Sequence, residues 1–307
     1  MLLSVGYVIA SILLLYFGAE FSLNSAEKIG KKLGFSPLFI GMVLVGFGTS
    51  LPEFFVAHIA AYDEKMTMAV GSLVGSNISN LCLILGVGSL LVSLKTFSNG
   101  LRKHLVIHCA LIPVLFFVAY NKSLQGLSMF LLLGLSLAYL QMLFIEMKQS
   151  RGMYQKEKID EQTYILLIKI IIGFVFLYLG GELLVKGGTE LAQGFGVSEY
   201  IISAILLAFG TSLPELITSF IACIKKIDTD VIIGNIIGSN LFNCALIMGS
   251  LGFYKADLVI SLNTELIILA IGSVGLLVLN LFKLPLNKIL GIGYLGLYGF
   301  MVYFWIS

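Results

Sequence analysis

The chain has 307 residues, of which 58% are apolar and only 12% charged, and its mean hydropathy is +1.01. Soluble domains carry about a quarter charged residues, so this composition excludes a soluble fold and predicts an integral membrane protein with little mass outside the bilayer. The formal net charge of +2 is too small to indicate a nucleic-acid partner.

Ten segments are apolar enough to be predicted as membrane-spanning helices, for which about 20 residues are needed. They are residues 2–24, 37–61, 67–93, 104–119, 125–146, 163–187, 198–223, 230–254, 261–281 and 287–306. The breaks between them hold most of the charged residues. We therefore expect an all-α fold, placed in the cell membrane as a multi-pass protein.

Lysine and arginine are distributed unequally between the two sides that these spans define. One side holds Lys28, Lys31, Lys32, Lys95, Arg102, Lys103, Lys148, Arg151, Lys156, Lys158, Lys225, Lys226, Lys283 and Lys288, whereas the other holds Lys65, Lys122, Lys186 and Lys255. Basic residues concentrate on the cytoplasmic side of membrane proteins. The first side is thus predicted to be cytoplasmic, and both termini are predicted to lie outside.

The sequence repeats itself. "YFGAEF" at 16–21 aligns with "YLGGEL" at 178–183, "FGTSLPE" recurs without change at 47–53 and 209–215, and "GSLVGSNISN" at 71–80 matches "GNIIGSNLFN" at 234–243. The chain therefore divides into a five-helix repeat (1–146), a cytoplasmic connector (147–162) and a second five-helix repeat (163–307). Because five is odd, the second repeat is inverted relative to the first, an arrangement typical of secondary transporters.

Each repeat places a glutamate, Glu53 or Glu215, deep in an apolar span. A charge at such a depth costs about 2.5–3.5 kcal/mol even on a lenient scale, which indicates a functional role. Pro52 and Pro214 precede the glutamates and should break the helix, freeing backbone carbonyls and placing each carboxylate at the N-terminus of a resumed helix. The preceding hydroxyl residues can share the face of the glutamate: Thr49 and Ser50 in the first repeat, Thr211 and Ser212 in the second.

The second motif adds an i, i+4 pair to each repeat, Ser76 with Asn80 and Ser239 with Asn243. Its glycines, at 71, 75, 234 and 238, should allow close helix approach. Hydrogen bonding between helices is the plainer role for Ser and Asn, but their repetition beside a matched glutamate favours ion ligation. Carboxylate, hydroxyl, amide and carbonyl oxygens suit hard cations, and two carboxylates with two threonine carbonyls would give Ca²⁺ about six ligands.

These paired motifs resemble the two α-repeats of the calcium/cation antiporter superfamily, in particular its Na⁺/Ca²⁺ exchanger branch of prokaryotic type. The resemblance covers the whole chain. It implies that Glu53 and Glu215 bind Ca²⁺ together with the carbonyls of Thr49 and Thr211. It also implies Na⁺ sites around the same glutamates, formed by Ser50, Ser76, Ser212, Ser239 and the carbonyls of Gly46 and Ala208, with Asn80 and Asn243 completing the centre. Some relatives, K⁺-dependent exchangers among them, carry Asp at the position of Asn243, so K⁺-independent exchange is expected.

The predicted activity is exchange of Na⁺ for Ca²⁺ by alternating access, electrogenic if three Na⁺ move per Ca²⁺ as in the family. The first and sixth spans would move across the rest. Neither a cofactor nor a protein partner is expected, and a monomer is sufficient. Two alternatives stay open: exchange of H⁺ for Ca²⁺ or another divalent cation, and an intramembrane hydrolase that uses both glutamates.

Two further pairs of polar residues are expected to have structural roles. Glu20 and Glu182 also match across the repeat, near span ends, and are expected to snorkel or to form a gate contact. His104 and His108 have the i, i+4 spacing of metal ligands, but no third ligand accompanies them.

Overall fold

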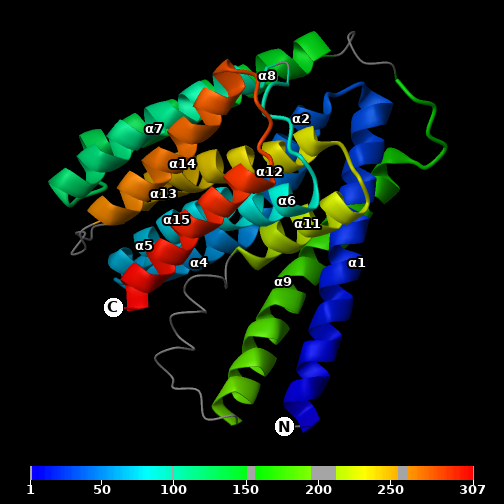
Figure 1. Cartoon of the computed structure of the whole chain (residues 1–307), viewed down its shortest axis with the longest axis horizontal. Helices are drawn as coiled ribbons and strands as arrows, with labels where there is room; N and C mark the ends of the chain where they lie inside the picture. Colours follow the sequence, from blue (N-terminus) through cyan, green and yellow to red (C-terminus); the bar gives the residue numbers. More distant parts are fainter. Residues whose placement is uncertain (1, 99, 151–155, 195–211, 255–261, 307) are drawn as a thin grey trace.

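The computed structural model describes residues 2–98, 100–150, 156–194, 212–254 and 262–306 (Figure 1). These residues form helices joined by short turns, and within them extended backbone pairs only at a single bridge between Leu94 and Leu286. Nine helices or continuous helix runs in the described residues are apolar and long enough to cross a membrane. The predicted all-α membrane fold is therefore confirmed.

In the first repeat, several predicted spans are divided into consecutive helical pieces. The elements are α1 (Leu2–Leu33), α2 (Pro37–Phe39), η1 (Ile40–Gly46), α3 (Phe47–Thr49), α4 (Leu51–Tyr62), α5 (Met66–Ile78), η2 (Ser79–Ile84), α6 (Leu85–Leu91), α7 (Leu101–Asn121) and α8 (Leu127–Ser150). The η elements are π-helical turns.

The second repeat follows the same order. Its elements are α9 (Thr163–Gly194), α11 (Leu213–Ile224), α12 (Thr229–Leu241), η3 (Phe242–Ile247), α13 (Met248–Leu251), α14 (Asn263–Leu281) and α15 (Lys288–Ile306). The predicted span 198–223 is described from Ser212 onward, and its earlier residues lie outside the described part of the chain.

Helix ends differ from the predicted spans where a helix continues beyond its apolar stretch. α1 runs to Leu33 rather than to residue 24, because Ala26 and Ile29 are buried against the protein while its lysines reach outward. α9 likewise runs to Gly194. α8 extends to Ser150, so the first residues of the predicted connector are helical.

α1 and α9 pack along each other and extend away from the other helices (Figure 1). Glycines bring the two backbones together: a Cβ atom added at Gly18 would lie 2.8 Å from the carbonyl oxygen of Gly173, and one at Gly187 would lie 2.9 Å from that of Ser4. Small residues of this kind allow close contact between helices in lipid. The two helices that begin the repeats therefore form one pair.

α5 and α12 form the centre of the remaining helices. Every residue of α12 from Val231 to Leu241 is buried. A Cβ at Gly234 would lie 2.5 Å from the carbonyl oxygen of Leu38, and one at Gly238 would lie 2.6 Å from that of Met42, as the sequence predicts for glycines that allow close approach. At Gly71 and Gly75 no described residue comes so close, and the segment that corresponds to 38–42 in the second repeat, 200–204, lies outside the described residues.

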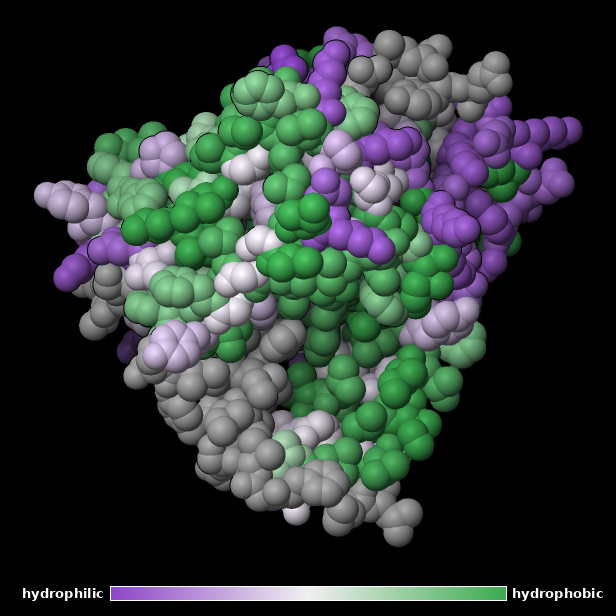
Figure 2. Space-filling view, in the orientation of Figure 1, coloured by the Kyte–Doolittle hydropathy of each residue, from purple (hydrophilic) through white to green (hydrophobic). Residues whose placement is uncertain are grey.

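The outer surface has the pattern expected of a membrane protein. Figure 2 shows hydrophobic side chains over most of the visible face and hydrophilic ones gathered beyond the C-terminal end of α1. Large apolar side chains on α1 and α9 are exposed, among them Ile12 and Ile171. Such a surface is stable in contact with lipid rather than with water.

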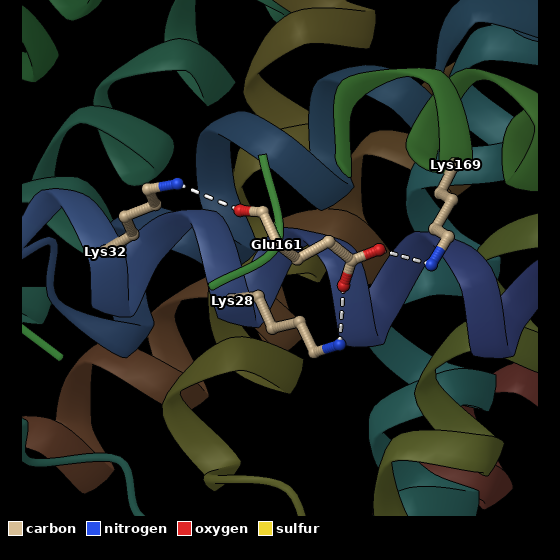
Figure 3. Close-up of polar contacts among 4 residues, drawn as sticks. All are labelled: Lys28, Lys32, Glu161 and Lys169. Atoms are coloured by element: carbon tan, nitrogen blue, oxygen red, sulfur yellow. Dashed lines mark hydrogen bonds and ion pairs between the residues drawn. The ribbon is translucent and has the colours of Figure 1, made fainter. Parts of the chain in front are cut away.

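The described end of the connector contacts both members of the α1–α9 pair (Figure 3). The carboxylate of Glu161 accepts a hydrogen bond from Lys28 Nζ of α1 at 2.8 Å and another from Lys169 of α9, and its carbonyl accepts one from Lys32 at 2.9 Å. A single residue outside the helices thus joins the ends of α1 and α9 on the side predicted to be cytoplasmic.

Candidate functional site

The helix that contains Glu53 breaks where the sequence predicts. α3 ends at Thr49, Ser50 adopts φ −83° and ψ 0°, and α4 begins at Leu51. Pro52 lies in the first turn of α4 and cannot donate a backbone hydrogen bond, so the break costs little at this position. Glu53 follows in the same first turn, where the helix dipole favours a negative charge.

Glu215 has the same local structure in the second repeat. Ser212 adopts φ −89° and ψ 6°, α11 begins at Leu213, and Pro214 and Glu215 occupy its first turn. The first hydrogen bonds of the two helices also match, because Phe54 N–H donates to the Ser50 carbonyl at 3.1 Å and Leu216 N–H donates to that of Ser212 at 3.0 Å. The repeated letters therefore encode the same helix start in both repeats, although the residues before Ser212 lie outside the described part of the chain.

Both carboxylates face the protein interior. Glu53 is 1% exposed and Glu215 is 0% exposed, so neither contacts lipid. Ser76 Oγ bonds both to Glu53 and to Ser212, the residue that precedes the first turn containing Glu215, so the two helix starts meet at one side chain. One buried centre thus contains an acid from each inverted half.

Hydroxyl and amide groups from both repeats meet at Ser76 of α5. Its Oγ donates to Glu53 Oε1 at 3.1 Å and accepts from Ser212 Oγ at 3.0 Å. The side-chain nitrogen of Asn243 donates to the same oxygen at 3.4 Å. Four of the predicted ligands are therefore joined in one network.

Asn80 and Asn243 lie in π-helical turns that the sequence analysis did not predict. η2 (Ser79–Ile84) and η3 (Phe242–Ile247) occupy equivalent positions in the two repeats. Hydrogen bonds in a π-turn span five residues instead of four, and such turns are frequent at functional sites. No proline marks them, and only their repetition in both halves could have suggested a shared irregularity.

The unpartnered buried oxygens in the described structure are concentrated at this centre. Six belong to predicted ligands: Ser50 Oγ, Glu53 Oε2, Asn80 Oδ1, both carboxylate oxygens of Glu215, and Asn243 Oδ1. A buried polar atom without a hydrogen bond costs on the order of 1–3 kcal/mol, so this group of oxygens around one point is suited to binding a cation. Oxygen atoms from carboxylates, amides and a hydroxyl fit a hard cation such as Ca²⁺ or Na⁺.

The remaining predicted ligands are placed as follows. Thr49 is 1% exposed, and its hydroxyl oxygen lies 3.3 Å from two acceptors, the Gly46 carbonyl and Asn235 Oδ1. The Gly46 carbonyl also accepts from Ser50 N–H at 3.2 Å. Ser239 Oγ donates to the Ile236 carbonyl at 3.2 Å. Thr211 and Ala208 lie outside the described residues.

Sequence reasoning missed several polar residues behind this centre. Asn77 and Asn240, one in each GSN motif, donate to each other's backbone carbonyls at 2.9 and 3.2 Å. His108, which was not expected to bind a metal because no third ligand accompanies it, faces Asn240, and His104 contacts Glu146. No group of three or more His, Cys, Asp or Glu residues in the described parts of the chain could hold a metal ion, so His104 and His108 do not form such a site there.

Comparison with known proteins gives a consistent result. The family described as sodium/calcium exchanger protein matches residues 3–152 and 165–307. The inner membrane protein YrbG of Escherichia coli is 34% identical over 258 residues, which cover 81% of this chain and 79% of that protein. The sodium/calcium exchanger MaX1 of Methanosarcina acetivorans is 28% identical over 293 residues, covering 80% and 82% respectively.

A solved structure shares the fold over nearly the full length. The structure of the sodium-calcium exchanger NCX_Mj soaked with Na⁺ and Sr²⁺ superposes with a TM-score of 0.84, at 26% identity, and covers 98% of both chains. The protein is thus a multi-pass membrane transporter that exchanges cations for Ca²⁺, not an enzyme, which removes the hydrolase alternative. The chain belongs to the sodium/calcium exchanger protein family.

Proposed function

We propose that this transporter couples Ca²⁺ movement to Na⁺ through the centre between Glu53 and Glu215. The observation that carries the proposal is the set of six unpartnered buried oxygens contributed by both repeats. Two carboxylates balance one divalent ion, and the neutral amide and hydroxyl oxygens complete its coordination. The same oxygens can hold Na⁺ when Ca²⁺ is absent, so the two ions compete for overlapping positions.

The carbonyls of Thr49, Thr211, Gly46 and Ala208 are proposed as additional ligands by their resemblance to the family motif. In this arrangement the helix breaks supply backbone oxygens and the GSN motifs supply side-chain oxygens. Because the ligands come from both inverted halves, a small displacement between helices can open the centre toward one side and close it toward the other.

The α1–α9 pair is the proposed moving part. Its two helices pack on each other through glycines and extend away from the other helices (Figure 1), whereas most residues of α5 and α12 are buried. Sliding of the pair across the ligand-bearing helices would change access without separating the ligands. If three Na⁺ exchange for one Ca²⁺, each cycle moves one net charge, which is worth about 2.3 kcal/mol per 100 mV.

Transport into proteoliposomes tests the coupling ion. Vesicles loaded with Na⁺ should take up radiolabelled Ca²⁺ from a Na⁺-free medium, and vesicles loaded with choline should not. An outward H⁺ gradient in choline-loaded vesicles tests the alternative in which the glutamates carry protons. Uptake driven by H⁺ alone would replace Na⁺ with H⁺ as the coupling ion, and uptake in neither condition would refute cation-coupled exchange.

Two further conditions test charge and K⁺ dependence. If the exchange is electrogenic, net positive charge leaves the Na⁺-loaded vesicle in each cycle. A membrane potential that is negative outside should then accelerate Ca²⁺ uptake. Replacing external K⁺ with choline should leave the rate unchanged, because Asn243 stands where K⁺-dependent relatives carry Asp. A K⁺ requirement would contradict this part of the proposal.

A further inference from the structure

We propose that Asn240, held by His108, is a positioning residue that turns the side-chain oxygen of Asn80 toward the ion centre. Asn240 lies on α12, His108 on α7 and Asn80 in η2, and all three side chains are buried. Neither Asn240 nor His108 is among the predicted ligands. The inference rests on the proposed function, because it concerns how one of the proposed ligands is oriented.

The orientation of the Asn80 amide follows from its hydrogen bonds. Its Nδ2 donates to Ser239 Oγ at 3.1 Å and to Asn240 Oδ1 at 3.0 Å, so both of its N–H groups are used. Ser239 donates its only hydroxyl proton to the Ile236 carbonyl, so its Oγ must be the acceptor in the hydrogen bond with Asn80. The Asn80 oxygen has no hydrogen-bond partner among the residues that the structure describes, so it can bind a cation.

Asn240 is itself fixed in one orientation. Its Oδ1 accepts from Asn80, and its Nδ2 donates to the Asn77 carbonyl at 3.2 Å and lies 3.4 Å from His108 Nε2. Turning this amide over would place an NH₂ group against the NH₂ group of Asn80 and an oxygen against a carbonyl. Because Asn240 Nδ2 is a donor, His108 Nε2 acts as the acceptor, and the ring carries its proton on Nδ1.

In the described part of the second repeat, no equivalent contact holds Asn243. Asn77 corresponds to Asn240, but its Oδ1 has no hydrogen-bond partner among the described residues, and its Nδ2 bonds to the Asn240 carbonyl and to Cys244 Sγ. Among the described residues, Asn243 donates to Ser76 Oγ, at 3.4 Å. Asn80 is therefore held by two short hydrogen bonds, whereas Asn243 is held by one long one.

The position of His108 explains the difference. The corresponding part of α14, residues 269–271, reads Leu-Ala-Ile, and none of these side chains can form a hydrogen bond. The contact that holds Asn240 thus comes from His108, a polar residue at a position where the second repeat is apolar. The two amide ligands are proposed to be unequal, with Asn80 pre-oriented and Asn243 free to adjust as ions exchange.

Binding of radiolabelled Ca²⁺ to purified protein in Na⁺-free detergent solution tests the inference. Asn240→Leu should raise the Ca²⁺ concentration for half-saturation about tenfold, the loss expected when a hydrogen bond that orients a ligand is removed. Asn77→Leu removes the reciprocal hydrogen bond, from Asn77 Nδ2 to the Asn240 carbonyl, and leaves the bonds of Asn80 in place, so it should change this concentration by less than about twofold. In proteoliposomes, Asn240→Leu should reach the parent rate at saturating Ca²⁺.

Two variants of His108 provide an independent arm if Asn240→Leu does not fold. His108→Gln retains an acceptor and should bind Ca²⁺ within about twofold of the parent, whereas His108→Leu should bind it about fivefold more weakly. If Asn240→Leu bound Ca²⁺ as tightly as Asn77→Leu, and His108→Leu as tightly as His108→Gln, the inference would be overturned and the proposed function would stay intact. Absence of Ca²⁺ binding by the parent protein would instead refute the proposed function.

Discussion

Lys225, which follows the last residue of α11, forms an ion pair with Glu20 in the middle of α1, with 2.6 Å between Lys225 Nζ and Glu20 Oε1. α11 carries Glu215 at its opposite end. The ion pair therefore connects a helix of the proposed moving pair to a helix that bears an ion ligand. Glu20 was expected either to snorkel or to form a gate contact, and its ion pair with Lys225 agrees with a gate contact.

Breaking this ion pair should change how readily α1 moves. We expect Glu20→Gln and Lys225→Met to shift the rate of Na⁺-driven Ca²⁺ uptake in the same direction, by up to about fivefold, since partly exposed ion pairs contribute about 0.2–1 kcal/mol. The double variant should resemble the single ones, because either change removes the same interaction. Additive effects in the double variant would show that the two residues act separately.

Replacing either central carboxylate should abolish transport. Glu53→Gln and Glu215→Gln each remove one of the two negative charges in the centre, and we expect Ca²⁺ uptake to fall at least about a hundredfold. Glu265→Gln is the matched control, because Glu265 is also buried but bonds to Trp305 Nε1 at 3.1 Å. Glu265→Gln should retain uptake, and loss of function in all three variants would point to a general effect on folding.

Adding a third carboxylate should strengthen Ca²⁺ binding. Asn243→Asp places a charged oxygen where Asn243 Oδ1 has no hydrogen-bond partner in the described parts of the chain. Because Ca²⁺ affinity rises with the number of charged ligands, the concentration for half-saturation should fall about tenfold, measured by radiolabelled Ca²⁺ binding. A weaker affinity would indicate that Asn243 does not face the bound ion.

Glu161 should hold the connector against the α1–α9 pair. Hydrogen bonds from Lys169 and Lys28 keep the pKa of this carboxyl below its usual range. Glu161 therefore stays ionised at neutral pH, and its contribution is lost only as the pH falls through this lowered pKa. Glu161→Gln should speed trypsin cleavage after Lys158 several-fold at pH 7.5, whereas Asp160→Asn should not. Equal cleavage of both variants and the parent would show that the contact does not restrain the connector.

The sequence was sufficient to predict the repeat, the helix breaks and the buried glutamates, because each depends on local chemistry. A proline fixes a break, and a charge within an apolar span must be buried. The π-turns at η2 and η3 were not predictable in this way, since no residue type requires them. Asn77, Asn240 and His108 were missed because their partners come from other helices, and pattern analysis along one helix does not identify such contacts.

Helix lengths were predicted least well for the same reason. α1 continues to Leu33 because Ala26 and Ile29 pack against neighbouring helices, although charged residues lie between them. A hydropathy rule ends the span where the apolar run ends, near residue 24. Burial of these later residues against other helices lets α1 continue beyond that point.

Ser76 accepts hydrogen bonds from Ser212 and Asn243 of the other repeat. Asn77 and Asn240 each donate a side-chain hydrogen bond to the backbone carbonyl of the other. Half of this polypeptide could therefore not assemble the pocket by itself. A single-copy ancestor of five helices would have needed two molecules inserted in opposite directions to bring both acids together. Joining the two repeats through the connector removes that requirement. It also allows the two repeats to differ in sequence, as they do at His108, where the second repeat has apolar residues.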